Sequence, residues 1–276
     1  MSMTVNTNVA ANRAMTQLNK AGRALSGSFA RISSGLRISK AADDSAGLGV
    51  AENLKVAAKS AKVAQRNVAD GISMIAVAEG ASSEVGSILG RMRELAVQSA
   101  SGTLGTAERA YVQDEFEALS AEVDRISGVT EFNGQKLTDG SLTTVAVQVG
   151  IHATADDQVD ITLGDLSAAT LGVDTTAVDM STSTGASAAL DVIDDAIEMV
   201  SGYRSDYGAA ENRLTSALNN LETFTENTTA AESQIRDADF GYETAEMSKN
   251  QIMQQAGTAI LAQAKSMNQG ALQLLQ

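Results

Sequence analysis

The chain of 276 residues contains no proline, cysteine or tryptophan and only one histidine. Without cysteine there is no disulfide framework, thiol nucleophile or cysteine zinc site. A single histidine leaves too few imidazoles for a histidine metal cluster. The chain also lacks H-E-x-x-H, P-loop and G-x-S-x-G motifs, so nothing in it supports an enzyme, a metal or another cofactor. Because proline breaks helix interiors, its absence favours long uninterrupted helices.

Positive charge is also scarce, with 20 lysines and arginines against 34 acidic residues and a net charge of −14. Phosphate binding depends on clustered basic residues, so nucleic acid is not an expected partner. No run of about 18 apolar residues occurs, and we therefore expect no membrane insertion. The N-terminus lacks the apolar core of a cleavable signal peptide.

Two long arrays of apolar residues repeat at alternating intervals of three and four. The first covers residues 54–96, and the second covers residues 193–235 and includes Leu214 and Leu221. Sustained heptads of this kind indicate helices packed as in coiled coils. Since the arrays are equally long, they predict two helices lying side by side.

The centre of the chain has a different pattern. Valine and isoleucine alternate with polar residues within residues 141–165, which predicts a β-hairpin. A stretch rich in serine, threonine, glycine and aspartate follows at 166–187 and predicts irregular structure. The single histidine, His152, is expected in the hairpin loop as a surface residue. Nearby aspartates match no EF-hand spacing and are interpreted as solvated turn residues.

Each end of the chain carries a thinner apolar stripe. The positions expected to form these seams include Leu25, Phe29 and Ile32 near one end, and Ile260 and Leu274 near the other. Such helices are marginal alone in water. They must therefore pack on each other, on the middle of the chain, or on other copies, and an ordinary intramolecular helical hairpin is one open interpretation.

The fold class expected from these patterns is mainly α. Both chain ends form a long coiled-coil-like helical bundle, and a small β-hairpin is inserted between them. The expected domains are residues 1–43 and 236–276, which form one helical domain together. Residues 44–235 form a second helical domain that includes the hairpin and the irregular segment.

The motifs then show a family resemblance. The chain contains VNTN at 5–8, ARISSGLRISKAADDSAGLGVAENL at 30–54 and RMRELAVQSASGT at 91–103. It continues with DRISGVTEFNGQKL at 124–137 and TAAESQIRDADFGYETAEMSKNQIMQQAGTAILAQA at 229–264. In this order the motifs resemble those of bacterial flagellins, over about residues 4–140 and 188–276.

The resemblance implies a structural subunit that polymerises into the flagellar filament for swimming. It implies an inner tube of N- and C-terminal helices and an outer helical tube, with large projecting domains missing here. It also implies type III export to the extracellular filament. Its expected partners are further copies, an export chaperone, and the cap and hook–filament junction proteins. The alternatives are a hook–filament junction protein or a soluble coiled-coil binding module.

The resemblance also implies recognition by innate immune receptors. The residues matching the surface bound by the animal flagellin receptor are Arg91, Leu95, Gln98 and Glu115. The residues near the core of the stretch read by the plant flagellin receptor are Asp43, Asp44 and Gly47. Arg91 and Leu95 are four residues apart, so we expect them on one accessible helix face beside the buried seam. All these residues could instead mediate contacts between subunits, and both roles could hold together.

Overall fold

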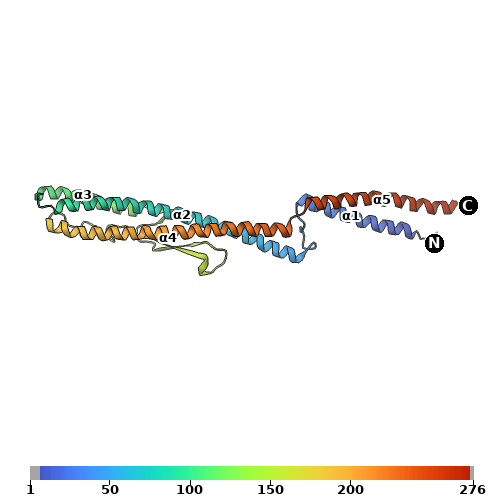
Figure 1. Ribbon diagram of the computed structural model, residues 1–276, viewed down its shortest axis with the longest axis horizontal. Helices are drawn as coiled ribbons and strands as arrows, with labels where there is room; N and C mark the ends of the chain where they lie inside the picture. The colour runs from blue at the N-terminus through green and yellow to red at the C-terminus, as the bar shows by residue number, and fades with distance from the viewer. Residues whose placement is uncertain (1–6, 274–276) are drawn as a thin grey trace. The chain divides into compact units, whose positions relative to one another are not determined.

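The computed structural model describes residues 7–273, with side chains to residue 266, so the predicted seam residue Leu274 lies outside the described residues. The fold is mainly helical, as predicted (Figure 1). The long helices are α1 (Val9–Ser34), α2 (Ser45–Ala100), α3 (Thr106–Val129), α4 (Ser183–Arg236) and α5 (Phe240–Gln273).

The helices belong to two compact units. The terminal unit comprises Met1–Ala57 and Glu226–Gln276, and the central unit comprises Ala58–Thr225. Both α2 and α4 contribute residues to each unit. The domain boundaries expected from the sequence, after residues 43 and 235, fall at the breaks between helices instead of at the limits of these units.

Within the central unit, α2 and α4 pack antiparallel. The Gln65 amide donates to the Thr225 hydroxyl near one end, and Arg93 pairs with Asp194 near the other. The predicted heptads form this contact, because the corresponding positions of α2 are buried. These positions are Ala61, Ala64, Val68, Gly71, Ile75, Ala78, Ser82, Val85, Leu89, Met92 and Ala96.

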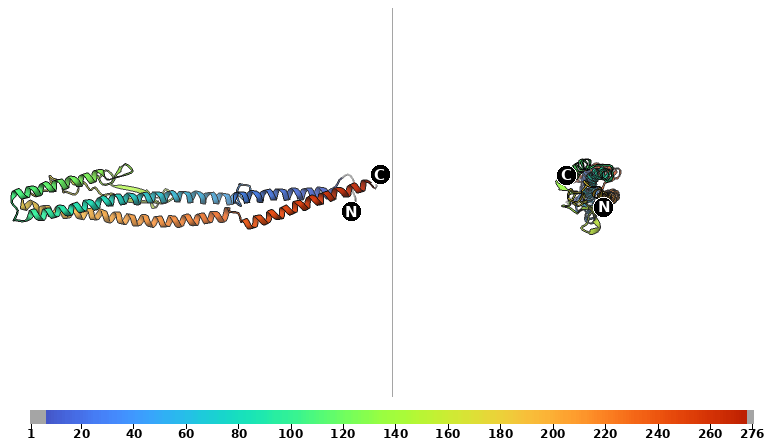
Figure 2. Two further views of the ribbon diagram at one scale, coloured as in Figure 1. Left: turned by 90° about the horizontal axis from the view of Figure 1, so that it is seen from above. Right: turned by 90° about the vertical axis from the view of Figure 1, so that its left-hand side faces the viewer.

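Helix α3 lies beside α2 in the central unit (Figure 2). Its buried Phe116 and Val123 join the same apolar core as Leu89 and Ile193. The segment between the hairpin and α4 has no helix or strand, yet it contributes Leu166 to this core. Two faces of α2 are therefore covered, one by α4 and one by α3.

Helix α4 begins earlier than the sequence predicts. It starts at Ser183, whereas the irregular segment was expected to continue to residue 187. The Thr182 hydroxyl accepts a hydrogen bond from the Gly185 amide at 3.0 Å, and this is the usual action of an N-cap threonine. The serine- and threonine-rich composition suggested irregular structure, although it includes the residue that caps the start of α4.

The predicted hairpin is confirmed. Strands β3 (Thr144–Gln148) and β4 (Gln158–Thr162) pair antiparallel, and their buried valines, Val147 and Val159, lie opposite each other. These valines pack on the core of α2 and α4. The alternating pattern therefore corresponds to a hairpin with one buried face and one solvent-exposed face.

A second, shorter hairpin joins α3 to this region. Its strands are β1 (Glu131–Phe132) and β2 (Gln135–Lys136). The turn residues Asn133 and Gly134 have φ angles of 50° and 79°. Two positive φ angles in a two-residue loop favour the Asn-Gly sequence.

By length and composition alone, α2 is the one helix among the described residues that could cross a membrane. Its alanines and valines raise the hydropathy, and 33% of the relevant window is buried. The seam that these small residues form contacts α3 and α4, which accounts for its apolar character.

One buried hydroxyl joins α4 to the end of the hairpin. Tyr207 is fully buried, and its hydroxyl accepts a hydrogen bond from the Gly164 amide at 3.1 Å. Burial raises the pKa of Tyr207. We expect Tyr207→Phe to lower the free energy of unfolding by about 1–2 kcal/mol, because the buried amide loses its acceptor. Urea unfolding measures this, and Tyr111→Phe is the control, since Tyr111 is 74% exposed. Equal stability of the two variants would contradict a role for this bond.

Candidate assembly and recognition surfaces

The terminal unit is built on an antiparallel pair, α1 and α5. The Arg31 side chain meets Glu243 at one end of the pair, and the Asn8 amide donates to the Ala264 carbonyl at the other, at 2.9 Å. The two helices lie side by side in both views (Figures 1 and 2). Residues far apart in the sequence therefore form one element of structure.

Small and polar residues line the contact between α1 and α5. On α1, Ala21 and Ser28 are buried, at 4% and 1% exposure. On α5, the buried residues are Glu243 and Asn250, at 5% and 7%. Small side chains let the helix backbones approach closely, but they bury little apolar area. The pair therefore gains less from the hydrophobic effect than the central unit does.

The predicted terminal seams are only partly buried within the subunit, and packing on other copies stays open for the exposed positions. Leu25 and Ile32 are half-buried, but Phe29 is 65% exposed and Ile260 is 58% exposed. The contact between α1 and α5 is made by residues next to the predicted ones. Ser28, for example, is buried in the contact, whereas the adjacent Phe29 is exposed. Because α1 carries small residues along one line and large apolar residues along the next, periodicity alone could not choose between them.

An apolar groove of about 380 Å³ lies along the α1–α5 pair. The exposed Met253 and Ile260 form part of its wall, at 45% and 58% exposure. Ile252, at 65% exposure, continues this apolar stripe on α5. The residues that line the groove are Ala10, Arg13, Ala14, Gln17, Met253, Ala256, Gly257 and Ile260.

One ion pair is buried within the α1–α5 contact. Arg31 Nε donates to Glu243 Oε1 at 2.6 Å, and the side chains are 32% and 7% exposed. The hydrogen bond from Arg31 lowers the pKa of Glu243, and this effect outweighs burial, which would raise it. The second carboxylate oxygen, Oε2, is buried without a hydrogen-bond partner. The charge of Glu243 therefore depends on Arg31 alone among the basic residues.

The connection between α1 and α2 holds the plant-receptor residues. Asp43 accepts hydrogen bonds from the Ser39 and Lys40 amides, and these bonds lower its pKa. Asp44 accepts from the Gly47 amide at 2.9 Å and so caps the start of α2. A Cβ atom at Gly47 would lie 2.5 Å from the Asp44 carboxylate, so a larger residue here would displace the capping side chain. Both aspartates are exposed on a turn of defined shape.

The animal-receptor residues do not share one accessible face. Arg91 is exposed and bonds to Glu115 of α3 at 2.7 Å, and Gln98 is exposed on α2. Leu95 is 1% exposed and belongs to the core of the central unit. The expectation that Leu95 lies on an open face is therefore wrong, because α3 covers the side of α2 next to the main seam. Helix periodicity placed Leu95 beside the seam but did not reveal this second contact.

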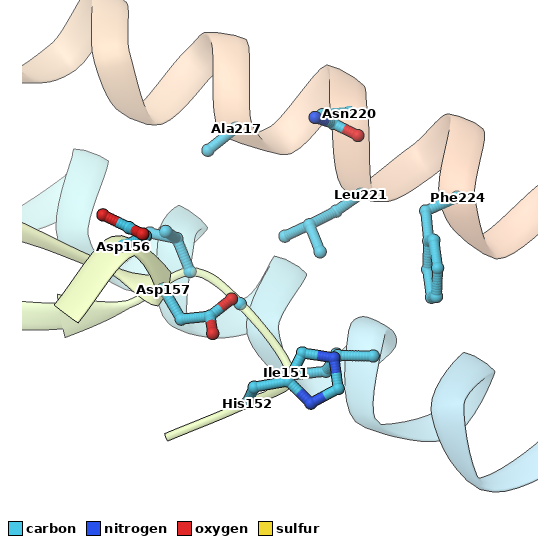
Figure 3. A pocket seen from close by; sticks show the side chains of 10 residues that line it. Ile151, His152, Asp156, Asp157, Ala217, Asn220, Leu221 and Phe224 are labelled. Atoms are coloured by element: carbon cyan, nitrogen blue, oxygen red, sulfur yellow. The ribbon is translucent and has the colours of Figure 1, made fainter. Parts of the chain in front are cut away.

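A pocket of about 360 Å³ lies between the β3–β4 loop and α4, in the central unit (Figure 3). Ile151 and His152 reach it from the loop, and Leu221 and Phe224 reach it from α4. His152 is exposed, as predicted. Among the described residues, no group of three or more His, Cys, Asp and Glu side chains could hold a metal ion. The pocket therefore presents an apolar wall and polar loop groups, without a metal centre.

The fold and these surfaces define a class of protein. It is a helical subunit that pairs its two chain ends and leaves large apolar side chains exposed along the pair. Comparison with known proteins identifies the family. Residues 5–143 match the bacterial flagellin N-terminal helical region, and residues 190–275 match the bacterial flagellin C-terminal helical region.

Individual relatives agree with this match. A flagellin of Halalkalibacterium halodurans is 45% identical over 246 residues, covering 89% of this chain and 90% of the relative. A flagellin of Bacillus subtilis is 39% identical over 308 residues, covering 99% and 100%. The crystal structure of Bacillus cereus flagellin aligns with 56% of this chain and 88% of its own, at 29% identity and a TM-score of 0.49.

The chain belongs to the bacterial flagellin family. It is a structural subunit of the bacterial flagellar filament, the extracellular organelle of swimming motility. The family consists of structural proteins, and its members polymerise with copies of themselves.

Proposed function

We propose that this subunit enters the filament through the terminal unit, with residues 1–43 and 236–276 forming the inner tube and residues 44–235 the outer tube. One observation supports the proposal most directly. The α1–α5 contact buries small and polar residues, whereas Phe29, Ile252 and Ile260 are exposed on the same pair. Exposed apolar side chains in such a row are typical of surfaces that other chains cover.

We propose the remaining partners from the resemblance to other flagellins. The subunit travels unfolded through the flagellar type III apparatus, accompanied by an export chaperone. It then meets the cap at the growing end and the hook–filament junction proteins at the base. The sequence offers one supporting feature: because it lacks cysteine, no disulfide has to form after export.

Polymerisation of the purified full chain tests the assembly proposal. We expect Ile260→Lys to abolish filament growth, because it places a charge in an apolar surface that must lose its water. Electron microscopy and sedimentation measure polymer length and yield. The matched control is Gln255→Lys, since Gln255 is exposed on α5 but does not line the apolar groove. Only short assemblies of wild-type protein would favour a hook–filament junction protein instead. Normal growth of the Ile260 variant would overturn the role of the stripe.

We propose that the free subunit is also a ligand of the animal flagellin receptor, through Arg91, Gln98 and Glu115. These side chains are exposed, and Arg91 already lies against Glu115. Leu95 then supports the site from the core instead of contacting the receptor. We likewise propose that the plant receptor reads the turn held by Asp43 and Asp44.

Receptor activation by monomer should separate these two roles. We expect Arg91→Ala to weaken the response at least tenfold while the thermal stability of the central unit changes little. Leu95→Ala should lower stability by about 3 kcal/mol, because it leaves a cavity in the core. Reporter-cell dose response and circular dichroism measure the two effects. Arg125→Ala is the control, since Arg125 is an exposed arginine of α3 that pairs with its neighbour Glu122. An unchanged dose response for the Arg91 variant would remove that residue from the site.

A further inference from the structure

Three neighbouring cations on α2 have no hydrogen-bond or ion-pair partner among the residues that the structure describes. Lys59, Lys62 and Arg66 are exposed and repeat at intervals of three and four residues, so they share one face of the helix. Within residues 58–225, all of which the structure describes, the only other basic residue without a hydrogen bond or ion pair is Arg213. The partnered basic residues are Arg91, Arg93, Arg109, Arg125, Lys136 and Arg204.

This basic stripe, Lys59, Lys62 and Arg66, is unusual on a chain with a net charge of −14. Like charges three and four residues apart repel each other along a helix. The stripe also points away from the seam that contacts α4, because Ala61, Ala64 and Val68 lie on the opposite side of α2. Acidic side chains of another molecule can therefore reach all three cations without disturbing the contact between α2 and α4.

The opposite charge pattern occurs on α4 of the same unit. Asp191, Asp195 and Glu198 are exposed and repeat at intervals of four and three, and their side chains make no hydrogen bond or ion pair within the described part of the chain. We call these three residues the acidic stripe. Read in reverse, their spacing is three and four, which equals the spacing of the basic stripe. Two antiparallel helices would therefore bring the three cations opposite the three carboxylates, over roughly 10 Å of helix.

We propose that the basic stripe of one subunit binds the acidic stripe of a second copy. Within one subunit α2 and α4 are antiparallel, and Arg93 lies opposite Asp194. Two copies that point the same way therefore place α2 of one antiparallel to α4 of the next. To bring Lys62 opposite Asp195, the second copy must be displaced by about 45 Å along the helix direction, at 1.5 Å per residue.

This contact joins two different surfaces, so each copy still offers one free stripe of each sign. Such heterologous contacts generate open helical polymers instead of closed dimers. The proposal rests on the self-assembly of this chain and adds the surfaces that align successive central units. Copies with a net charge of −14 repel each other, and a contact between stripes of opposite charge offsets part of this repulsion.

Charge reversal of each stripe tests the pairing. One variant carries Lys59→Glu, Lys62→Glu and Arg66→Glu, and the other carries Asp191→Lys, Asp195→Lys and Glu198→Lys. We expect each variant alone to raise the critical concentration for polymerisation at least tenfold, about 1.4 kcal/mol. An equimolar mixture should polymerise within threefold of wild type, because every contact between unlike variants is again complementary.

The design separates this contact from general repulsion. The second variant is less negative than wild type, so general repulsion predicts easier polymerisation, whereas the proposed contact predicts harder polymerisation. Arg213→Glu is the control for an unpartnered cation outside the stripe, and it should polymerise normally. Higher salt should lessen the difference between each variant and wild type, because it screens the contact between the stripes.

The outcomes are distinguishable by sedimentation and circular dichroism. Wild-type filaments together with normal polymerisation of both variants, or failure of the mixture with helix content intact, would overturn the pairing and leave the filament function standing. Loss of binding to anionic lipid vesicles by the first variant, with normal polymerisation, would assign the basic stripe to another partner and would also overturn the pairing. Failure of wild-type protein to polymerise would overturn both.

Discussion

Replacing Leu214 by aspartate should cost the central unit at least about 4 kcal/mol of unfolding free energy. Leu214 is 0% exposed and lies in the core between α2, α4 and the β3–β4 hairpin. The substitution removes apolar contacts and puts a carboxylate where no basic residue pairs with it. Natural domains are stable by only about 5–15 kcal/mol, so this is a large share of the total.

Thr215→Asp is the matched control, because it introduces the same side chain one position away on the exposed side of α4. A surface substitution of this kind usually changes stability by about 0.5 kcal/mol or less. Thermal melts followed by circular dichroism compare the two variants. The deficit of the Leu214 variant should shrink as the pH falls, since a buried aspartate tolerates the neutral form better. Similar melting of both variants would show that the α2–α4 seam is misplaced.

Removing the cation from the buried ion pair of the terminal unit should separate α1 from α5. We expect Arg31→Ala to destabilise this pairing by about 3 kcal/mol at neutral pH, because Glu243 would keep a buried charge without a partner. Hydrogen exchange of the α1 amides measures the pairing directly. Glu243→Gln should cost less, since the amide oxygen can still accept from Arg31.

The same pair predicts how the terminal unit responds to acid. The folded-state pKa of Glu243 lies below its usual value of 4.5. Its contribution to stability is therefore fully present above about pH 4.5 and is lost as the pH falls through the lower, folded-state pKa. Glu243→Gln should remove this part of the acid response. Identical acid profiles for wild type and Glu243→Gln would mean that other carboxylates govern it.

The sequence was most informative where a repeat of apolar residues is compatible with only one kind of secondary structure and packing. The heptad arrays predicted the α2–α4 contact, including the buried Gly71 and Ser82. Both are small, so each fits between packed helices although neither is strongly apolar. Alternating residues likewise predicted the β3–β4 hairpin, because only a strand with one buried face produces that period.

The sequence was least informative where a helix has more than one neighbour. Leu95 could be placed on α2 but not under α3, because periodicity reports a face and does not report how many elements cover it. On α1, the contact uses Ser28 in place of the larger Phe29. A small residue such as Ser28 lets the backbones of α1 and α5 approach closely. The hydrophobicity of the neighbouring side chains therefore did not indicate which face of α1 contacts α5.

The antiparallel pairing of α1 and α5 also affects whether a truncated chain can fold. Asn8 binds the carbonyl of Ala264, 256 residues further along the chain. The α1–α5 contact can form completely only when residues near Ala264 are present. A chain shortened by premature termination would keep an α1 without its counterpart. Such an incomplete chain should therefore not form the terminal unit, and we expect it to be excluded from the filament.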